Sequence, residues 1–197
     1  MPIAKFSSLQ SLVASLTKSE KRHFALFTNR LNSNDGAIYL KLFHLMTKHP
    51  EKEESYFASQ CSTAAKSNFT NAKRHLFSQI LRSLRIQYGE SDNVFRARQK
   101  IDHAMILYKR GFYHESLSLL KSLNLVDSHI DDIIALEGAE LQKRIESRHI
   151  TRSRGTKNRI EKLIAESKRY LETVSIESEM LNVCLEVQGL YLSLIHI

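Results

Sequence analysis

Apolar residues recur along almost the whole chain at the three- to four-residue spacing of amphipathic helices. The longest stripe runs from Phe69 to Tyr88 and places apolar side chains on one helical face throughout. No stretch shows two-residue alternation bounded by turn residues, so the pattern predicts no sheet. We expect helices over residues 7–16, 17–31, 37–48, 53–61, 67–88, 93–110, 113–126, 128–148, 157–174 and 176–194.

Capping residues mark several of the expected boundaries. Thr17 and Glu20 form a capping-box pattern at the start of one helix, and Ser128 with Asp131 suggests a cap for another. Gly89 is placed to end the longest helix of the N-terminal half. These signals agree with the apolar spacing, and they support the prediction of an all-α fold.

Composition supports the same fold class. The 197 residues include only 6 Gly and 2 Pro, whereas sheet folds need many turns built from these residues. The scarcity of glycine also disfavours glycine-rich nucleotide sites. The sequence therefore predicts helices joined by short connections.

The charge is uneven along the chain. The net charge is +8, and residues 1–90 contribute +7 of it through 13 basic and 6 acidic side chains. The turn expected at Gly89 coincides with this change in charge. We therefore expect two regions: a basic helical region at 1–90 and a set of helical hairpins at 91–197.

One segment, residues 97–130, has the features of a helix-turn-helix repeat. Small residues would let its two helices approach closely, a glycine would form the left-handed turn, and leucines would fill the shared face. A second unit begins at corresponding positions around Gly138. The residues expected to have these structural roles are Ala104, Leu107, Gly111, Tyr113, Ser116, Leu120 and Gly138.

This pattern resembles the tetratricopeptide repeat, a 34-residue helical hairpin. The resemblance implies antiparallel hairpins stacked as a solenoid, with a third repeat starting at residue 176 and a surface that docks a protein or peptide. Lys100 and Ser128 depart from the family, which prefers Trp and Pro at those places. An unrelated helical bundle is the alternative.

The N-terminal half also has a resemblance. Its segments 16–24, 39–43 and 82–85 are similar to the start of a group of uncharacterised bacterial helical-repeat proteins. The resemblance implies no activity, but it implies that members are longer than this chain. The chain stops inside an apolar helical pattern without a cap. We therefore expect a C-terminally truncated fragment whose last few residues are not native.

Residues that could carry chemistry are scattered. The nine histidines show no metal-ligand spacing, and neither a phosphate-binding loop nor a serine-hydrolase motif is present. Cys61 and Cys184 are too far apart in sequence to suggest a disulfide framework, which suits a reducing compartment. With no signal peptide or membrane-spanning pattern, we expect a cytoplasmic protein without catalytic residues, metal or cofactor.

The strongest candidate for a binding site is a basic segment. Between Ser55 and Gly89 no acidic residue occurs, and the expected helices 53–61 and 67–88 could form a helix-turn-helix. Asn68, Asn71 and Gln79 are residue types that read bases. The positive charges are those of Lys66, Lys73, Arg74, Arg82 and Arg85. The alternative is a solvated basic face without a ligand.

Two hypotheses about function follow. The first is a non-enzymatic protein-interaction or scaffold protein whose helical repeats bind a protein or peptide. The second is a nucleic-acid-binding protein that docks through residues 53–88. An enzyme is the weakest interpretation, since no nucleophile, base or metal set emerges. No small-molecule substrate is indicated.

Overall fold

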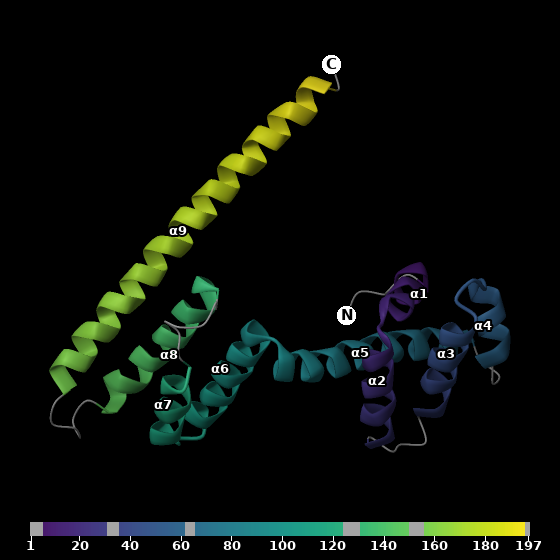
Figure 1. Cartoon of the computed structure of the whole chain (residues 1–197), viewed down its shortest axis with the longest axis horizontal. Coiled ribbons are helices and arrows are strands. Elements are labelled where there is room, and N and C mark those ends of the chain that lie inside the picture. Colours follow the sequence, from purple (N-terminus) through teal and green to yellow (C-terminus); the bar gives the residue numbers. More distant parts are fainter. Residues whose placement is uncertain (1–5, 31–35, 62–65, 124–130, 150–155, 196–197) are drawn as a thin grey trace. The chain divides into compact units, whose positions relative to one another are not determined.

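A computed structural model describes residues 6–30, 36–61, 66–123, 131–149 and 156–195. All regular secondary structure within these ranges is α-helical (Figure 1), which confirms the all-α prediction. The described helices are α1 (Phe6–Ser15), α2 (Lys18–Arg30), α3 (Gly36–Lys48), α4 (Glu54–Cys61), α5 (Lys66–Ser91), α6 (Asn93–Lys109), α7 (Tyr113–Lys121), α8 (Asp132–His149) and α9 (Thr156–Ile195).

The chain divides into two compact units, residues 1–90 and 91–197. Each unit has its own hydrophobic core, as a separate domain requires. We call residues 1–90 unit 1 and residues 91–197 unit 2.

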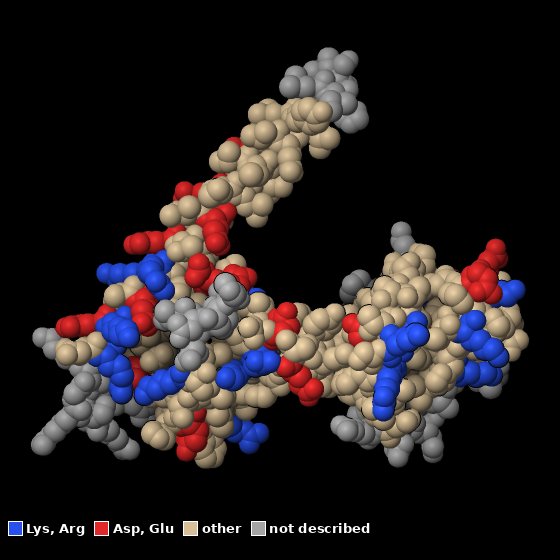
Figure 2. All heavy atoms as spheres, viewed as in Figure 1, with Lys and Arg blue, Asp and Glu red and all other residues tan. Residues whose placement is uncertain are grey.

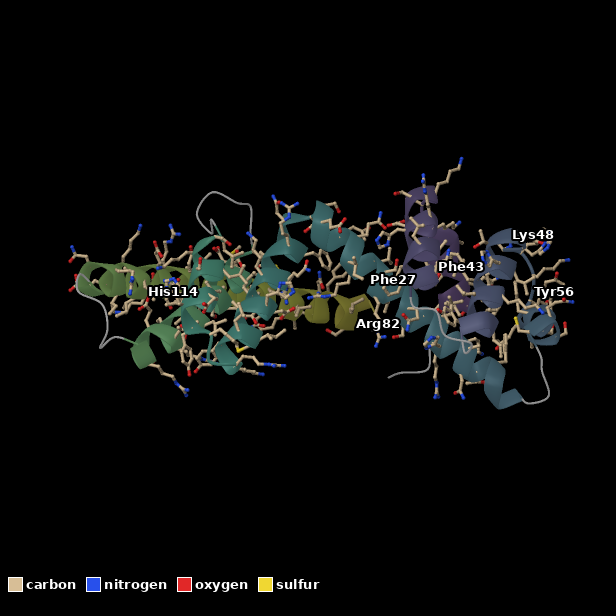
Figure 3. The ribbon with its side chains drawn as sticks, turned by 90° about the horizontal axis from the view of Figure 1, so that it is seen from below. Phe27, Phe43, Lys48, Tyr56, Arg82 and His114 are labelled. Carbon is tan, nitrogen blue, oxygen red and sulfur yellow. The ribbon has the colours of Figure 1, made fainter. Side chains whose placement is uncertain are left out.

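Unit 1 is organised around the apolar stripe of α5. Leu76 and Ile80 are almost completely buried, together with Phe24 of α2 and Leu42 of α3. The Phe24 and Phe43 rings pack with centroids 4.5 Å apart, and Phe43 lies among these helices (Figure 3). The 3.6-residue spacing therefore identifies the buried side of α5.

The capping box at the start of α2 is confirmed. The Glu20 backbone N–H donates to Thr17 Oγ1 at 3.2 Å, and the Thr17 backbone N–H donates to Glu20 Oε2 at 2.7 Å. Two backbone donors that the helix leaves unpaired are thereby satisfied. The capping residues fix the first turn of α2.

In unit 2, α6 and α7 form a hairpin around Gly111. This glycine has φ = +84°, a value that L-residues with a Cβ rarely adopt. The Phe112 N–H donates to the Leu107 carbonyl at 2.9 Å, and the Gly111 N–H donates to the Tyr108 carbonyl at 3.0 Å. These two bonds form a Schellman motif. The turn therefore requires a glycine at the predicted position.

Close packing joins the two helices of this hairpin. Ala104 and Ser116 are both fully buried, and Leu120 is 3% exposed. Leu107 and Tyr113 are half-buried, and the Tyr113 ring packs edge-on against Tyr108 with centroids 5.8 Å apart. The shared face is thus made of small residues and leucines.

Helix α8 packs against α6, α7 and α9. Ala135 and Ala139 of α8 form a buried cluster with Leu163 and Tyr170 of α9, and Gly138 lies buried on the same helix. Small side chains allow the axes of two helices to approach. The successive hairpins α6–α7 and α8–α9 are therefore contiguous.

Three expected helix boundaries are wrong. Helix α7 ends at Lys121, with Ser122 as its C-cap, and not at residue 126. Gly89 lies inside α5, which continues to Ser91, because this glycine is buried with a helical backbone and Asp92 caps α6 immediately afterwards. The break expected near residue 175 is absent, so no separate helix starts at 176. Ser175 costs a helix little, and neither Gly nor Pro interrupts residues 157–188. Ser128, part of the expected cap, lies outside the described residues; the Ile133 N–H donates to Asp131 Oδ1.

Candidate functional site

Of the five basic residues expected to bind nucleic acid, the structure describes four side chains and gives them two different environments. Lys73 is only 12% exposed in its side chain and forms an ion pair with Glu54 of α4. Its ammonium group also lies 5.2 Å from the centre of the Phe69 ring. Lys73 therefore fixes α4 to α5, and its charge is already paired.

Three arginines of α5 are exposed: Arg74, Arg82 and Arg85. Their spacing of i, i+8 and i+11 places them on one helical side, about 12 Å and about 4.5 Å apart along the axis. Lys66 is the first residue of α5, and its side chain lies outside the described residues. The basic surface on this helix is therefore a row of arginines.

The expected base-reading residues do not form one surface. Gln79 is 5% exposed, so it faces the core of unit 1 and does not reach a groove of DNA. Asn71 is exposed, and Asn68 is in the first turn of α5 with its side chain outside the described part of the structure. Since α5 buries its middle turns against the rest of unit 1, the structure corrects the prediction that Gln79 reads a base.

A serine–histidine contact in unit 1 was not predicted. His23 Nδ1 lies 2.8 Å from Ser83 Oγ and joins α2 to α5. Sixty residues separate the two, so no sequence motif could indicate the pair. Ser83 is 2% exposed, which leaves its hydroxyl inaccessible to a substrate. The contact supports packing of the helices and does not form an active site.

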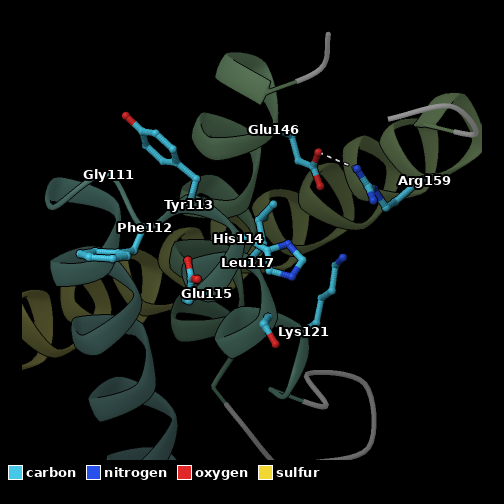
Figure 4. A pocket seen from close by; sticks show the side chains of 10 residues that line it. Gly111, Phe112, Tyr113, His114, Glu115, Leu117, Lys121, Glu146 and Arg159 are labelled. Atoms are coloured by element: carbon cyan, nitrogen blue, oxygen red, sulfur yellow. Dashed lines mark hydrogen bonds and ion pairs between the residues drawn. The ribbon is translucent and has the colours of Figure 1, made fainter. Parts of the chain in front are cut away.

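Unit 2 contains a cavity of about 620 Å³ at the turn between α6 and α7 (Figure 4). One side of α7 lines it with His114, Leu117, Ser118 and Lys121, at the i, i+3, i+4 and i+7 spacing of a single helical face. The volume falls within the range of small-molecule and peptide pockets. The remaining lining residues are Gly111, Phe112, Tyr113, Glu115, Glu146 and Arg159.

An ion pair between α8 and α9 closes one end of this cavity. Arg159 Nη2 donates to Glu146 Oε2 at 2.7 Å. The Glu146 side chain is only 6% exposed. Within the described residues, Glu146 Oε1 and Arg159 Nε are buried without a hydrogen-bond partner. A water-sized probe cannot reach either atom, so neither contributes to the accessible surface of the cavity.

Helix α9 presents a second feature of unit 2. Its side chains from 175 to 193 are all exposed, because α8 covers only the first half of the helix. Five of its apolar residues share one side at alternating four- and three-residue spacing, and each is 59–65% exposed. We call this set the α9 apolar face: Ile176, Met180, Val183, Val187 and Leu190.

The charges around the α9 apolar face have one sign. Residues 171–195 include four glutamates and no Lys, Arg or Asp. Figure 2 shows acidic but no basic side chains along this part of the helix. The surface is therefore apolar with acidic borders.

Groups that could hold a metal are absent from the described part of the chain: no cluster of three or more His, Cys, Asp or Glu occurs there. Cys61 is buried, and this burial raises the pKa of its thiol, while Cys184 is exposed. Among the helices described, none is long and apolar enough to span a membrane. The cavity and the α9 apolar face are therefore the features that suggest binding.

Comparison with known proteins gives no match. No family model matches the chain, and neither a curated protein nor a solved structure is significantly similar to it.

Proposed function

We propose that this protein is a non-enzymatic protein-interaction module, a scaffold whose second unit is built from tetratricopeptide-like hairpins. The Schellman turn at Gly111 and the buried contact between Ser116 and Ala104 support the likeness to that repeat. The packing of α8 against both helices of the preceding hairpin also supports it. Such stacked hairpins provide extended surfaces for protein partners.

The observation that carries this proposal is the α9 apolar face. Contiguous exposed apolar surface is unusual unless a partner covers it. Its alternating spacing from Ile176 to Leu190 is the pattern by which one helix packs along another. The occupant is a partner helix with an apolar stripe of the same spacing.

Charge specifies the partner further. Glu177, Glu179 and Glu186 border the α9 apolar face, and no basic residue lies among them. A partner helix with Lys or Arg beside its apolar stripe gains attraction, whereas an acidic one is repelled. The partner is therefore a basic amphipathic helix.

Two synthetic helices test this proposal. Both have 21 residues with leucine at the packing positions, and they differ only in flanking lysine or glutamate. We expect the lysine peptide to bind the full chain at least tenfold more tightly in fluorescence anisotropy, and salt to reduce the difference. Equal affinities, or no binding by either peptide, would refute the proposal.

A variant pair localises the binding. The double substitution Met180→Lys and Val187→Lys places positive charge in the α9 apolar face, and we expect it to abolish binding of the lysine peptide. Glu161→Lys changes the charge of an exposed residue on the first half of the same helix and serves as the control. If Glu161→Lys weakened binding as much, the partner would dock elsewhere.

A second candidate is nucleic-acid binding by unit 1. The row formed by Arg74, Arg82 and Arg85 favours it, because exposed arginines at helical spacing can contact successive phosphates. The burial of Gln79 and the ion pair of Lys73 weaken base-specific docking. Binding of this kind would depend on the charge of the nucleic-acid phosphates and not on the base sequence.

A further inference from the structure

The side of α9 that packs against α8 continues beyond the part that α8 covers (Figure 1). Ser167 and Tyr170 are buried on this side, and Ser167 Oγ donates to Glu140 Oε1 of α8 at 3.0 Å. Val174 is half-buried, and every side chain from 175 to 193 is exposed. The cover therefore ends near Val174, whereas the helix itself continues.

Beyond Ser167, the residues on this side recur at three- and four-residue spacing as far as Leu192. The steps average about 3.6 residues, the repeat of an α-helix, so the positions stay on one side of α9. Leu181, Leu185 and Leu192 are each 56–60% exposed. Since each residue turns a helix by about 100°, this side lies opposite the α9 apolar face. We call the uncovered set the second stripe: Val174, Ser178, Leu181, Leu185, Gln188 and Leu192.

The second stripe has the same pattern when it is read in either direction. Its order is apolar, polar, apolar, apolar, polar, apolar. In two antiparallel copies, Leu181 of one chain would lie opposite Leu185 of the other, and Val174 opposite Leu192. The polar residues Ser178 and Gln188 would also meet, as a donor and an acceptor. The stripe is therefore complementary to itself, as an isologous two-fold interface requires.

Charge does not oppose this pairing. Three of the four glutamates in this part of α9 recur every seven residues on another side of the helix: Glu172, Glu179 and Glu186. The positions that border the second stripe carry one charge, that of Glu177, and antiparallel pairing would place it beside the uncharged Tyr191 of the second copy. An interface between like copies is thus free of the repulsion that acidic borders would cause.

The position of α8 decides the direction of the two helices. Up to Val174, α8 occupies the same side of α9 as the second stripe. In a parallel pair, the two α8 helices would need the same space between the two α9 helices, which pack only 8–10 Å apart, a range of about one helix diameter. In an antiparallel pair, the two α8 helices lie at opposite ends of the interface. Packing therefore favours the antiparallel direction.

We propose that two copies of this chain form an antiparallel dimer through their second stripes, with the two-fold axis near Val183. The interface continues the α8–α9 packing, so each α9 is covered on this side along its whole length. The two α9 apolar faces point away from the interface and stay accessible. The dimer uses the opposite side of α9 from the proposed partner helix, so it does not rest on the proposed function.

The mass of the full chain in solution tests the dimer. At about 100 µM chain we expect light scattering to give twice the 22.7 kDa of one chain. The double substitution Leu181→Lys and Leu185→Lys should weaken dimerisation by about a hundredfold or more, because four lysines would meet in the interface. Met180→Lys with Val187→Lys adds the same charge on the opposite side and should remain dimeric. All four residues are exposed in one chain, so circular dichroism should show both variants folded.

Cross-linking of Cys184 tests the direction of the helices. Cys184 is exposed and borders the second stripe next to the two-fold axis, whereas Cys61 is buried. In the antiparallel dimer the two Cys184 side chains lie side by side, and we expect a short bismaleimide to link them. In a parallel pair they would lie on opposite sides of the interface. Val183→Cys in a Cys184→Ser background is the matched control, because residue 183 points away from the interface, and it should not link.

Each result bears on the dimer alone. The mass of a single chain at about 100 µM would overturn the proposal, and so would a Leu181→Lys, Leu185→Lys variant that stays dimeric. A dimer whose Cys184 does not link, or links no better than the Val183→Cys control, would overturn the antiparallel interface. Binding of the lysine peptide by a monomeric chain would refute the dimer and leave the proposed function standing. A dimer that binds neither peptide would do the reverse.

Discussion

The hydroxyl of Ser116 donates a hydrogen bond of 2.7 Å to the carbonyl of Ala104. Both residues are fully buried, and they lie on opposite helices of the α6–α7 hairpin. The bond satisfies a polar side chain inside an apolar interface, where an unpaired hydroxyl would be costly. It therefore contributes to the stability of unit 2 and also fixes how closely the helices approach.

We predict that Ser116→Ala lowers the free energy of unfolding by about 1 kcal/mol, because it removes one buried hydrogen bond. Ser116→Leu should cost more, since a fully buried site has no room for extra methylene groups. Urea unfolding followed by circular dichroism measures both. Ser118→Ala, at an exposed position of the same helix, is the control and should change stability by less than about 0.5 kcal/mol. If Ser116→Ala left the free energy of unfolding unchanged, the hydrogen bond to Ala104 would not contribute to stability.

Two glycines should respond in opposite directions to alanine. At Gly111 a Cβ would meet no atom within 4 Å, but φ is +84°. Gly111→Ala should therefore destabilise by about 1–2 kcal/mol through backbone strain alone. At Gly189, inside α9, a Cβ also meets nothing within 4 Å, so Gly189→Ala should stabilise the helix by up to about 1 kcal/mol.

Urea unfolding measures the effect at Gly111, and amide hydrogen exchange of residues 186–191 measures the effect at Gly189. A stabilising Gly111→Ala would contradict the left-handed turn. Unchanged or faster exchange in Gly189→Ala would contradict a continuous helix through this part of α9.

Local signals in the sequence predicted most of the helices because each depends on neighbouring residues. The Thr17–Glu20 capping box and the glycine turn at 111 are determined within a few positions. Gly89 misled the prediction, since a glycine ends a helix only where the backbone turns left-handed, and burial in unit 1 keeps it helical. Tertiary packing thus overrode a local preference.

The candidate sites were less predictable than the helices. The cavity depends on Glu146 and Arg159, which belong to different helices and show no motif. The apolar residues of 176–190 were visible in the sequence, but their spacing is equally typical of a buried helix. Only the structure shows that α8 leaves them exposed. Likewise, the sequence shows which residues are basic, but it does not show that Lys73 of α5 forms an ion pair with Glu54 of α4.

Glu20 should make stability depend on pH. Hydrogen bonds from the Thr17 backbone and hydroxyl, with a smaller one from Tyr88, hold the pKa of Glu20 below its ordinary value of 4.5. Because the folded-state pKa is the lower one, this stabilisation is complete above about pH 4.5 and is lost as pH falls through the folded-state pKa.

Glu20→Gln keeps an acceptor for the capping box but does not titrate. We expect the wild-type chain to be more stable than this variant at pH 7, and the difference to shrink steadily below pH 4.5. Urea unfolding at pH 7, 4 and 3 measures it. A difference of the same size at pH 3 would exclude the ionised carboxylate as its source.

Nucleic-acid binding through unit 1 predicts a specific dependence on salt. Three exposed arginines on one side of α5 can neutralise at most about three phosphates, so the logarithm of affinity should fall with a slope near −3 against the logarithm of salt concentration. Substituting Arg74, Arg82 and Arg85 together by glutamine should abolish binding to duplex DNA at 50 mM salt in a fluorescence titration.

Lys73→Gln should instead lower the stability of unit 1, because it breaks the ion pair with Glu54. Sequence preference should be absent, given the buried Gln79. Binding retained by the triple variant, or no binding of the wild-type chain at 50 mM salt, would leave these arginines as a solvated basic face.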